Sequence, residues 1–507
     1  MWTVGYITED EYKQAKAMPF LILDEPNIAH DEVIKYGEIV TYVLNEVAEK
    51  MDTDFEGAKY SGLEIYTSFD PKAYDAVRNA LQNDSLYPPS ASDGSKSQTA
   101  VSIVNPKNGE ILALSGGREA PKFTELNRAY QSKRQPGSSF KPIIDYAPAI
   151  ESGKFHPWSV LIDQPGTTFR GGYAPKNYSG KGNGKMTMVD ALKVSQNIPA
   201  VYLLDNTGID YAIRFAERLG IHFTDADRYL PIALGGLSEG VSTLQMADAY
   251  QGFANGGYRI PAHMVKRMVN TDGEVVFEAP SELTDSHRVM QPQTAEYMRY
   301  MLQNAVQSGT GTSAQVSGEL VGGKTGTTDK NKDLWFTGFT SEFTMSVWLG
   351  YDNPQTINGG SYMSAKIFSD IGKKLAETYP DGDVKFTTPK KITPKVESLE
   401  LKGSYNEKGK VISLSWEDIE DSTYDLYRNG EAIAKDLKKT SYKDTKLEEG
   451  KTYEYRVVGH NNYTNFETHK SNSLTFEIEK TKKAPSSAKI NASNITTNRK
   501  TPATLAA

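Results

Sequence analysis

Apolar residues first recur at helical spacing between residues 30 and 50. These positions predict an amphipathic helix; they are Val33, Ile34, Ile39, Val40, Val43, Leu44 and Val47. Residues 62–71 then alternate between apolar and polar side chains, which predicts a strand. At its end Asp70 can cap a helix whose first position is Pro71, so we expect a helix running to about Leu81.

A hairpin is predicted over residues 98–114, with strands at 99–104 and 110–114 and an Asn-Pro-Lys-Asn-Gly turn between them. Strands return over residues 334–339 and 344–349. Strands at both ends of a domain with helices between them predict an α+β fold, in which helices pack on an antiparallel sheet. This sheet is expected to pair the early hairpin with the late strands.

Helical patterns dominate between these strands, from Lys141 to about Asn255. The last predicted helix covers residues 241–250, and Gly256-Gly257 marks the end of this region.

A different pattern begins after the Pro/Lys/Thr-rich stretch at residues 387–395, which is typical of a linker. Short strands are predicted at residues 412–416, 424–428 and 452–458, with Asn429-Gly430 as a hairpin turn. Regularly spaced short strands over about 90 residues indicate a β-sandwich. From Lys480 onward apolar residues are scarce, which predicts disorder.

Composition excludes several classes of function. The chain has 507 residues and a net charge of −7, which argues against binding to nucleic acid through basic surfaces. It has no cysteine, so disulfides and thiolate chemistry are excluded. No run of 18 apolar residues and no signal-peptide pattern is present.

Candidate chemistry lies in three motifs, which are Ser138-Ser139-Phe140-Lys141, Ser195-Gln196-Asn197 and Lys324-Thr325-Gly326-Thr327. A serine hydroxyl becomes an effective nucleophile when a base lies within hydrogen-bond reach. The spacing of Ser138 and Lys141 places both on one face if a helix begins there. Such a start would also direct free N–H groups at a reacting carbonyl. The first motif alone is weak, because Ser486-Ser487-Ala488-Lys489 has the same pattern.

A phosphate-binding loop competes for the third motif, because residues 318–325 fit the pattern G-x-x-x-x-G-K-[ST]. Such a loop needs an apolar strand before Gly318 and a helix starting at Lys324. The preceding residues have no apolar run, and Gly326-Thr327-Thr328 is a poor helix start. The pattern therefore favours a strand whose small residues let a substrate lie along its edge.

The three motifs, in this order, resemble those of the transpeptidase half of class A penicillin-binding proteins. The resemblance extends over residues 1 to about 380 and includes residues 304–312 and 335–339. It implies the penicilloyl-serine transferase (β-lactamase-like) form of the α+β fold. The expected organisation is a glycosyltransferase remnant and linker at 1–65, a transpeptidase domain at 66–388, a linker at 389–395, a fibronectin type III-like sandwich at 396–480 and a disordered tail at 481–507.

By this resemblance the chain is a peptidoglycan D-alanyl-D-alanine transpeptidase. Ser138 would be the nucleophile and Lys141 its base. Ser195 would relay protons, and Asn197 would orient the lysine and the substrate. Lys324, Thr325, Gly326 and Thr327 would hold the substrate carboxylate, and the N–H groups of Ser138 and Thr327 would form the oxyanion hole. No metal or organic cofactor is implied.

Partners also follow from the resemblance. These are peptidoglycan stem peptides, β-lactams that acylate Ser138, and proteins of the wall-synthesis machinery, with no nucleic acid. An N-terminal glycosyltransferase domain and membrane anchor, absent from this chain, would hold the protein at the extracytoplasmic face of a bacterial membrane.

Other functions share parts of this pattern. A D,D-carboxypeptidase or a β-lactamase uses the same acylation but transfers the acyl group to water. A non-catalytic wall-binding or β-lactam-sensing protein could keep the fold, and a nucleotide-binding protein would use the phosphate-loop pattern.

The two motif lysines are expected to differ in charge. As a base Lys141 must be neutral, which requires lowering its pKa by about 3 units from the usual 10.4. Burial against Ile143 and Ile144 and the positive charge of Lys324 could supply this shift. Lys324 itself is expected to stay charged, because it pairs with a carboxylate.

Overall fold

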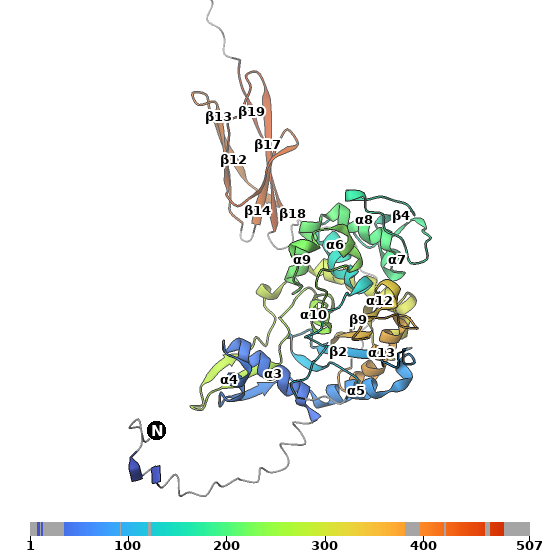
Figure 1. Cartoon of the computed structure of the whole chain (residues 1–507). Coiled ribbons are helices and arrows are strands. Elements are labelled where there is room, and N and C mark those ends of the chain that lie inside the picture. The colour runs from blue at the N-terminus through green and yellow to red at the C-terminus, as the bar shows by residue number, and fades with distance from the viewer. Residues whose placement is uncertain are drawn as a thin grey trace, which may run out of the picture. The chain divides into compact units, whose positions relative to one another are not determined.

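The computed structural model describes residues 8–10, 12–13, 35–91, 93–119, 123–380, 396–419, 422–461 and 467–480. The chain divides into two compact units, and the division falls at about residue 394 of the sequence (Figure 1). Each has its own hydrophobic core, and each is described by itself. The predicted linker at 389–395 and tail at 481–507 lie outside the described residues.

A five-stranded antiparallel sheet forms the centre of the first unit, in the order β3-β2-β10-β9-β8. The predicted hairpin is β2 and β3, and it pairs with the late strands through β10, as expected. The strands are β2 (Gln98–Val104), β3 (Ile111–Ser115), β8 (Gly322–Thr327), β9 (Asp333–Phe339) and β10 (Thr344–Gly350). The predicted α+β class is confirmed.

Helices cover both faces of this sheet. Thr243 of α10 (Thr243–Ala249) shares a 2.9 Å hydrogen bond with Ser102 of β2, on the face that also carries Thr337. Phe336, the next residue along β9, points to the opposite face and contacts Phe368 of α13 (Tyr362–Ala376). Lys324 pairs with Thr337 in register, so its side chain lies on the α10 face.

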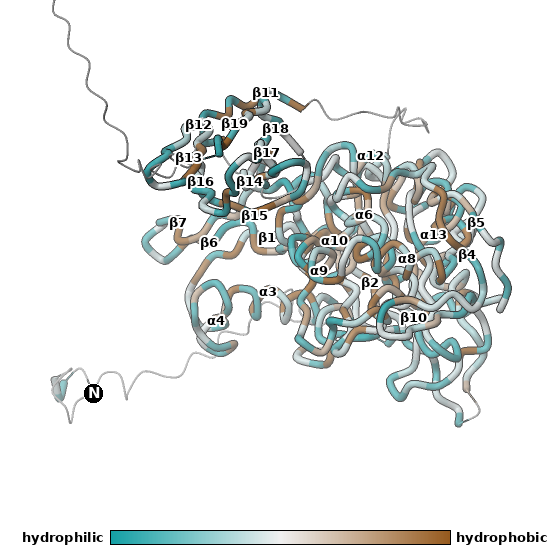
Figure 2. The backbone as a smooth tube through the Cα atoms, turned by 90° about the horizontal axis from the view of Figure 1, so that it is seen from above, coloured by the Kyte–Doolittle hydropathy of each residue, from teal (hydrophilic) through white to brown (hydrophobic). Residues whose placement is uncertain are grey.

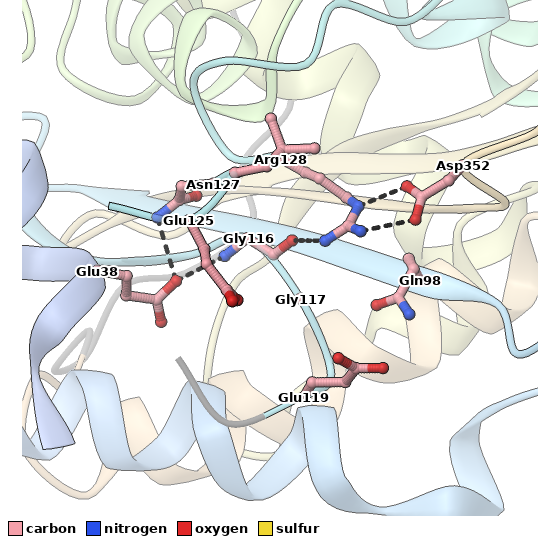
Figure 3. A pocket seen from close by; sticks show the side chains of 10 residues that line it. Glu38, Gln98, Gly116, Gly117, Glu119, Glu125, Asn127, Arg128 and Asp352 are labelled. Carbon is pink, nitrogen blue, oxygen red and sulfur yellow. Dashed lines mark hydrogen bonds and ion pairs between the residues drawn. The ribbon is translucent and has the colours of Figure 1, made fainter. Parts of the chain in front are cut away.

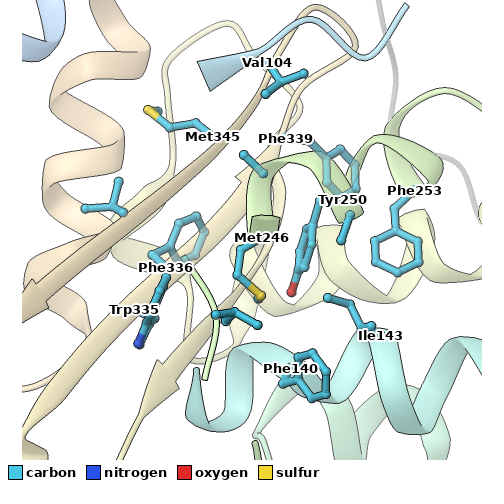
Figure 4. Packing of buried hydrophobic residues seen from close by; sticks show 14 of the residues in the cluster. Val104, Phe140, Ile143, Met246, Tyr250, Phe253, Trp335, Phe336, Phe339 and Met345 are labelled. Carbon is cyan, nitrogen blue, oxygen red and sulfur yellow. The ribbon is translucent and has the colours of Figure 1, made fainter. Parts of the chain in front are cut away.

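The α10 face is packed with large apolar side chains (Figure 4). This cluster joins the sheet to the segment that follows the first motif, and its members include Phe140, Ile143, Met246, Tyr250, Phe253, Trp335 and Phe339. The segment that carries Ser138 is therefore fixed to the sheet by the main core.

The predicted early elements are present. The first predicted helix is α3 (Gly37–Lys50), and residues 30–34 of that prediction lie outside the described part of the chain. Asp70 caps α5 (Pro71–Gln82) by accepting hydrogen bonds from the N–H groups of Lys72 and Ala73, as its sequence predicts. The strand before it is β1 (Glu64–Thr67), and the short α4 (Phe55–Lys59) lies between.

The middle of the unit is helical, as predicted, but it also contains strands that the sequence analysis missed. A hairpin of β4 (Val160–Asp163) and β5 (Gly184–Thr187) lies within it, and β6 (Val265–Val269) and β7 (Val275–Glu278) complete a small sheet with β1. The helices are α6 (Ala147–Glu151), α7 (Met188–Lys193), α8 (Asn197–Thr207), α9 (Ile209–Arg218), α10, α11 (Gln251–Ala254) and α12 (Pro292–Ser308).

The second unit is a pair of sheets, β11-β18-β17-β14-β15 with β19 on β17, and β12-β13-β16. The three predicted strands correspond to β13, β14 and β17, and Asn429-Gly430 is the predicted turn. Hydrophobic and hydrophilic residues alternate along the strands, so one face of each sheet supplies the shared core (Figure 2). The strands are β11 (Glu397–Leu399), β12 (Leu401–Asn406), β13 (Val411–Trp416), β14 (Ser422–Arg428), β15 (Glu431–Leu437), β16 (Ser441–Asp444), β17 (Thr452–Asn461), β18 (Glu467–Ser471) and β19 (Leu474–Glu477).

Among the described residues, every helix is too short or too polar to span a membrane.

Separate cores predict separate stability. Ending the chain after Lys391 removes the second core and leaves the first intact, so the unfolding midpoint of the first unit should stay within about 4 °C, the shift that roughly 1 kcal/mol gives in a domain of this size. Differential scanning calorimetry of the two chain lengths measures this. Loss of the cooperative transition in the shorter chain would show that the two units depend on each other for folding.

Candidate active site

Pro142 determines the shape of the segment that carries the first motif. Proline has no N–H group, so residue 142 cannot donate to the carbonyl of Ser138 as an α-helix requires. The N–H of Lys141 bonds that carbonyl instead and closes a 3₁₀ turn over Gly137–Phe140. A π-helical turn over Pro142–Tyr146 follows, and α6 continues from it. The predicted regular helix is thus replaced by a tighter turn, in which residues i and i+3 eclipse. Ser138 and Lys141 have this spacing.

Hydrogen bonds from three elements hold this turn. The indole N–H of Trp335 in β9 donates to the carbonyl of Gln135 at 2.8 Å. The Tyr250 hydroxyl donates to the carbonyl of Ser139 at 2.7 Å. On the third side, the backbone N–H of Leu237 donates to Gln135 Oε1 at 2.7 Å. The backbone around Ser138 is therefore positioned by both the sheet and the helical region.

Two glycines allow the turn and strand β8 to approach each other closely. A Cβ atom on Gly326 would lie 2.3 Å from the carbonyl oxygen of Pro136. Gly137 has φ +54°, and a Cβ there would lie 2.5 Å from the carbonyl oxygen of Thr327. Any larger residue at either position would push the strand away from Ser138.

The third motif lies in a strand. Lys324 is in the middle of β8, which pairs along its whole length with β9. A phosphate loop would need Lys324 at the start of a helix, so the nucleotide-binding alternative is wrong.

The second motif occupies a strained turn between α7 and α8. Ser195 has φ +62°, a left-handed conformation that costs a non-glycine residue on the order of 1–3 kcal/mol. Asn177 holds the turn in place, since its Oδ1 accepts from the N–H groups of Asn197 at 2.9 Å and Ile198 at 3.1 Å. Asp163 in turn accepts from Asn177 Nδ2 at 2.6 Å and from Gln196 Nε2 at 3.3 Å.

Lys141 is joined to this turn by hydrogen bonds. Its Nζ lies 2.7 Å from Asn197 Oδ1, 2.8 Å from the Ser195 carbonyl oxygen and 3.0 Å from the Gln196 carbonyl oxygen. Lys324 Nζ donates to Ser195 Oγ at 2.8 Å, and that oxygen is 3.5 Å from Lys141 Nζ. The Ser195 hydroxyl thus lies between the two amines and can pass a proton between them.

Both lysines are fully buried, and burial lowers the pKa of each. The pKa of Lys141 falls to about 7, against the opposing charge of Asp145. This supports the prediction that Lys141 is neutral in the working site, although burial, and not the charge of Lys324, is the main cause.

Lys324 differs from its prediction. Burial, and then the positive charge of Lys141, hold its pKa well below the usual range. Both causes disfavour the ammonium form, so the direction of this shift runs against the expectation that Lys324 stays charged. Its burial depends on packing between β8 and the helical region, which the motif itself does not reveal.

A cavity of about 460 Å³ opens beside the three motifs. Ser138, Asn197 and Thr327 all line it. The other lining residues, none of them singled out by the sequence, are Gln135, Gly137, Tyr173, Pro231, Leu234, Gly235, Gly236, Thr328, Asp329, Lys332 and Asp333. One predicted site residue of each motif therefore lines the same cavity, whereas the other predicted residues are not part of its lining; these are Lys141, Ser195, Lys324, Thr325 and Gly326.

The supporting residues Asp163 and Asn177 were also missed. They belong to the β4–β5 region and bond the second motif from at least 20 residues away. A lone Asp and a lone Asn in loop-like sequence give no signal of such a role.

A second cavity of about 330 Å³ lies elsewhere in the first unit (Figure 3). Arg128 forms a bidentate ion pair with Asp352 there, at 2.6 and 2.7 Å. Glu38 accepts hydrogen bonds from Asn127 Nδ2 and from the N–H of Gly116. These polar groups satisfy one another, and none of the three motifs reaches this cavity.

Comparison with known proteins identifies the family. Residues 99–373, more than half of the chain, match the family described as penicillin binding protein transpeptidase domain. The chain belongs to this family. All three motifs lie within the matched residues.

Curated relatives of this chain also carry the name penicillin-binding protein. Penicillin-binding protein 1F of Bacillus subtilis is 34% identical over 416 residues, which are 78% of this chain and 56% of that protein. Penicillin-binding protein 1A/1B of the same organism is 34% identical over 426 residues, 79% of this chain and 44% of that protein. The chain thus spans about half the length of these relatives.

Solved structures share the fold. The PonA1 protein from Mycobacterium tuberculosis in complex with penicillin V superposes with a TM-score of 0.60 at 24% identity, covering 71% of this chain and 97% of that one. Penicillin-Binding Protein 1A from Haemophilus influenzae gives a TM-score of 0.54 at 22% identity, covering 80% of this chain and 77% of that one. The predicted penicilloyl-serine transferase fold is confirmed.

The pKa of Lys141 predicts a pH dependence. A base must be unprotonated to act, so acylation of the serine should fall below the pKa of about 7. We expect the rate to drop about tenfold between its alkaline plateau and pH 6, as one controlling group requires. Stopped-flow acylation by a fluorescent penicillin measures the profile. A rate that stays constant down to pH 5 would contradict this assignment.

Arginine substitutions separate the two lysines. Lys141→Arg keeps a cation but removes any neutral base, so acylation should fall ~100-fold or more. Lys324→Arg still offers a cation to a carboxylate and should be milder, at about tenfold. The same acylation assay compares both with the parent chain. The reverse order of effects would exchange the two roles.

Proposed function

We propose that this chain is a serine D-alanyl-D-alanine transpeptidase that cross-links peptidoglycan stem peptides and is acylated by β-lactams. The observation that carries the proposal is convergence: Lys141 and Lys324, from segments 183 residues apart, both contact the Ser195 hydroxyl beside the cavity that Ser138 lines.

Acylation begins at Ser138. Its Oγ attacks the carbonyl between the two terminal D-alanines, and neutral Lys141 takes the hydroxyl proton. The N–H groups of Ser138 and Thr327 would stabilise the resulting oxyanion, an interaction whose loss costs ~3 kcal/mol in comparable enzymes. The last D-alanine then leaves, and the acyl group remains as an ester on Ser138.

The second motif serves the leaving group. Ser195 Oγ is bonded to Lys324 and lies near Lys141, so it can deliver the proton that the departing D-alanine amine needs. Asn197 Oδ1 orients Lys141 through the 2.7 Å hydrogen bond.

A substrate carboxylate would counteract the lowering of the Lys324 pKa that burial and Lys141 cause. A negative charge beside a buried amine raises its pKa, so the substrate itself would favour the ammonium form of Lys324. Thr325, Gly326 and Thr327 would complete the carboxylate site along β8. The buried Lys324 amine would then bind the substrate most strongly through its carboxylate.

We further propose the place of this chain in a longer protein. Residues 1–65 would follow a glycosyltransferase domain and membrane anchor, residues 66–388 form the transpeptidase domain, and residues 396–480 form a fibronectin type III-like module. The protein would act outside the cytoplasm at the cell membrane, together with wall-synthesis proteins. Relatives about twice as long as the matched region support this arrangement.

A D,D-carboxypeptidase or β-lactamase would use the same acylation and is distinguished by its acceptor. Both transfer the acyl group to water, whereas a transpeptidase transfers it to an amine. A non-catalytic sensor would form the acyl-enzyme but release no D-alanine from a stem peptide.

The proposal predicts a penicillin adduct on Ser138. One equivalent of penicillin should bind covalently to the full chain, and peptide mapping by mass spectrometry should find it on Ser138. Ser138→Ala should give no adduct. Ser486→Ala is the matched control, because it removes the other serine with the same local pattern and should label fully. An adduct on any other serine would refute the assignment of the nucleophile.

A further inference from the structure

The cavity beside Ser138 carries two charged side chains that the acylation chemistry does not use. Asp329 and Lys332 both line it. Within the described residues, neither forms an ion pair or a side-chain hydrogen bond. A third charged residue, Asp333, is committed to the fold, since it accepts from Trp348 Nε1 and Thr328 Oγ1 at 3.0 Å and is almost fully buried.

The loop that presents these two charges has a fixed and unusual conformation. Lys330 and Asn331 have φ values of +58° and +52°, both left-handed. Asn331 anchors the loop by donating from Nδ2 to the carbonyl of Gly359 at 3.0 Å and accepting from the N–H of Ile357 at 3.0 Å. Such a conformation persists only where its surroundings enforce it.

Asp329 shares the lining of the cavity with Tyr173. The pKa of the Tyr173 hydroxyl is raised by burial and then by the negative charge of Asp329. Tyr173 follows the 3₁₀ turn Arg170–Gly172, so the carboxylate acts across to a different part of the chain. One unpaired anion and one unpaired cation thus lie at the cavity that holds the nucleophile.

We propose that Asp329 and Lys332 bind the acceptor of the transpeptidation reaction, and that this acceptor is an amino acid centre carrying both an ammonium and an adjacent carboxylate. Asp329 receives the ammonium and Lys332 the carboxylate. A simple primary amine would leave Lys332 unmatched, so the pair selects zwitterionic over purely cationic acceptors. This inference rests on the proposed function.

The chemical step balances without a further reactant. The acceptor nitrogen forms a bond to the acyl carbon as the bond from that carbon to Ser138 Oγ breaks. Of the two protons that the ammonium loses, one returns to Ser138 Oγ and one passes to Lys141 and then to solvent.

The test measures how the acyl-enzyme divides between amine and water. The full chain is given an N-acyl-D-alanyl thioester as donor, with D-alanine as the zwitterionic acceptor or D-alaninamide as the cationic one. The ratio of aminolysis to hydrolysis does not depend on the acylation rate. Each variant is compared with the parent for one acceptor at a time, so the different basicities of the two amines cancel.

Asp329→Asn should lower the ratio about fivefold with both acceptors, the scale of an exposed ion pair. Lys332→Gln should lower it about fivefold with D-alanine and leave it unchanged with D-alaninamide. Asp329→Glu keeps the carboxylate and should restore most of the effect. Lys330→Gln is the matched control, because it removes a charge from the same loop at a position that does not line the cavity.

Two results would overturn the inference: an unchanged ratio in Asp329→Asn, or an equal effect of Lys332→Gln on both acceptors. A parent chain that passes its acyl group only to water, or that is not acylated by penicillin at all, would instead refute the proposed function on which this inference rests.

Discussion

The burial of two lysine amines around one serine hydroxyl is the constraint on which this site depends. In water both amines would be ammonium groups, and an ammonium group cannot accept a proton. Burial removes that preference, and the oxygens of Ser195, Gln196 and Asn197 supply the polar partners that a buried amine requires. The large helical region and the sheet are needed because neither alone can exclude water from both lysines.

Convergence of the motifs follows from a few local rules. Pro142 prevents a regular helix and brings Ser138 into register with Lys141. Glycines at 137 and 326 let the turn and the edge strand meet. Asn177, itself fixed by Asp163, holds the second motif against Lys141. The effect of Pro142 is local, whereas the glycines and Asn177 act between segments that are distant along the chain.

Much of this could be predicted from the sequence, and the reasons differ between features. Strong local patterns predicted the Asp70 cap and the hairpin at 98–114. Because strands occur at both ends of the domain sequence, the pairing of that hairpin with the late strands could also be predicted. The β6–β7 hairpin was missed although Asp272-Gly273 is a recognisable turn between two valine-rich runs. The irregular turn at Ser138 was missed although Pro142 implies it. The lowered pKa of Lys324 could not be predicted, because its burial arises only when the whole core is assembled.

Ser195 has a consequence for the evolution and engineering of this fold. Glycine adopts a positive φ without the steric cost that serine carries, so a glycine at position 195 would relieve the strain of this turn and keep the carbonyl that binds Lys141. It would also delete the hydroxyl that connects the two amines. Selection for thermal stability alone could therefore favour the loss of this hydroxyl. A variant stabilised in this way would be expected to have lost its catalytic turnover.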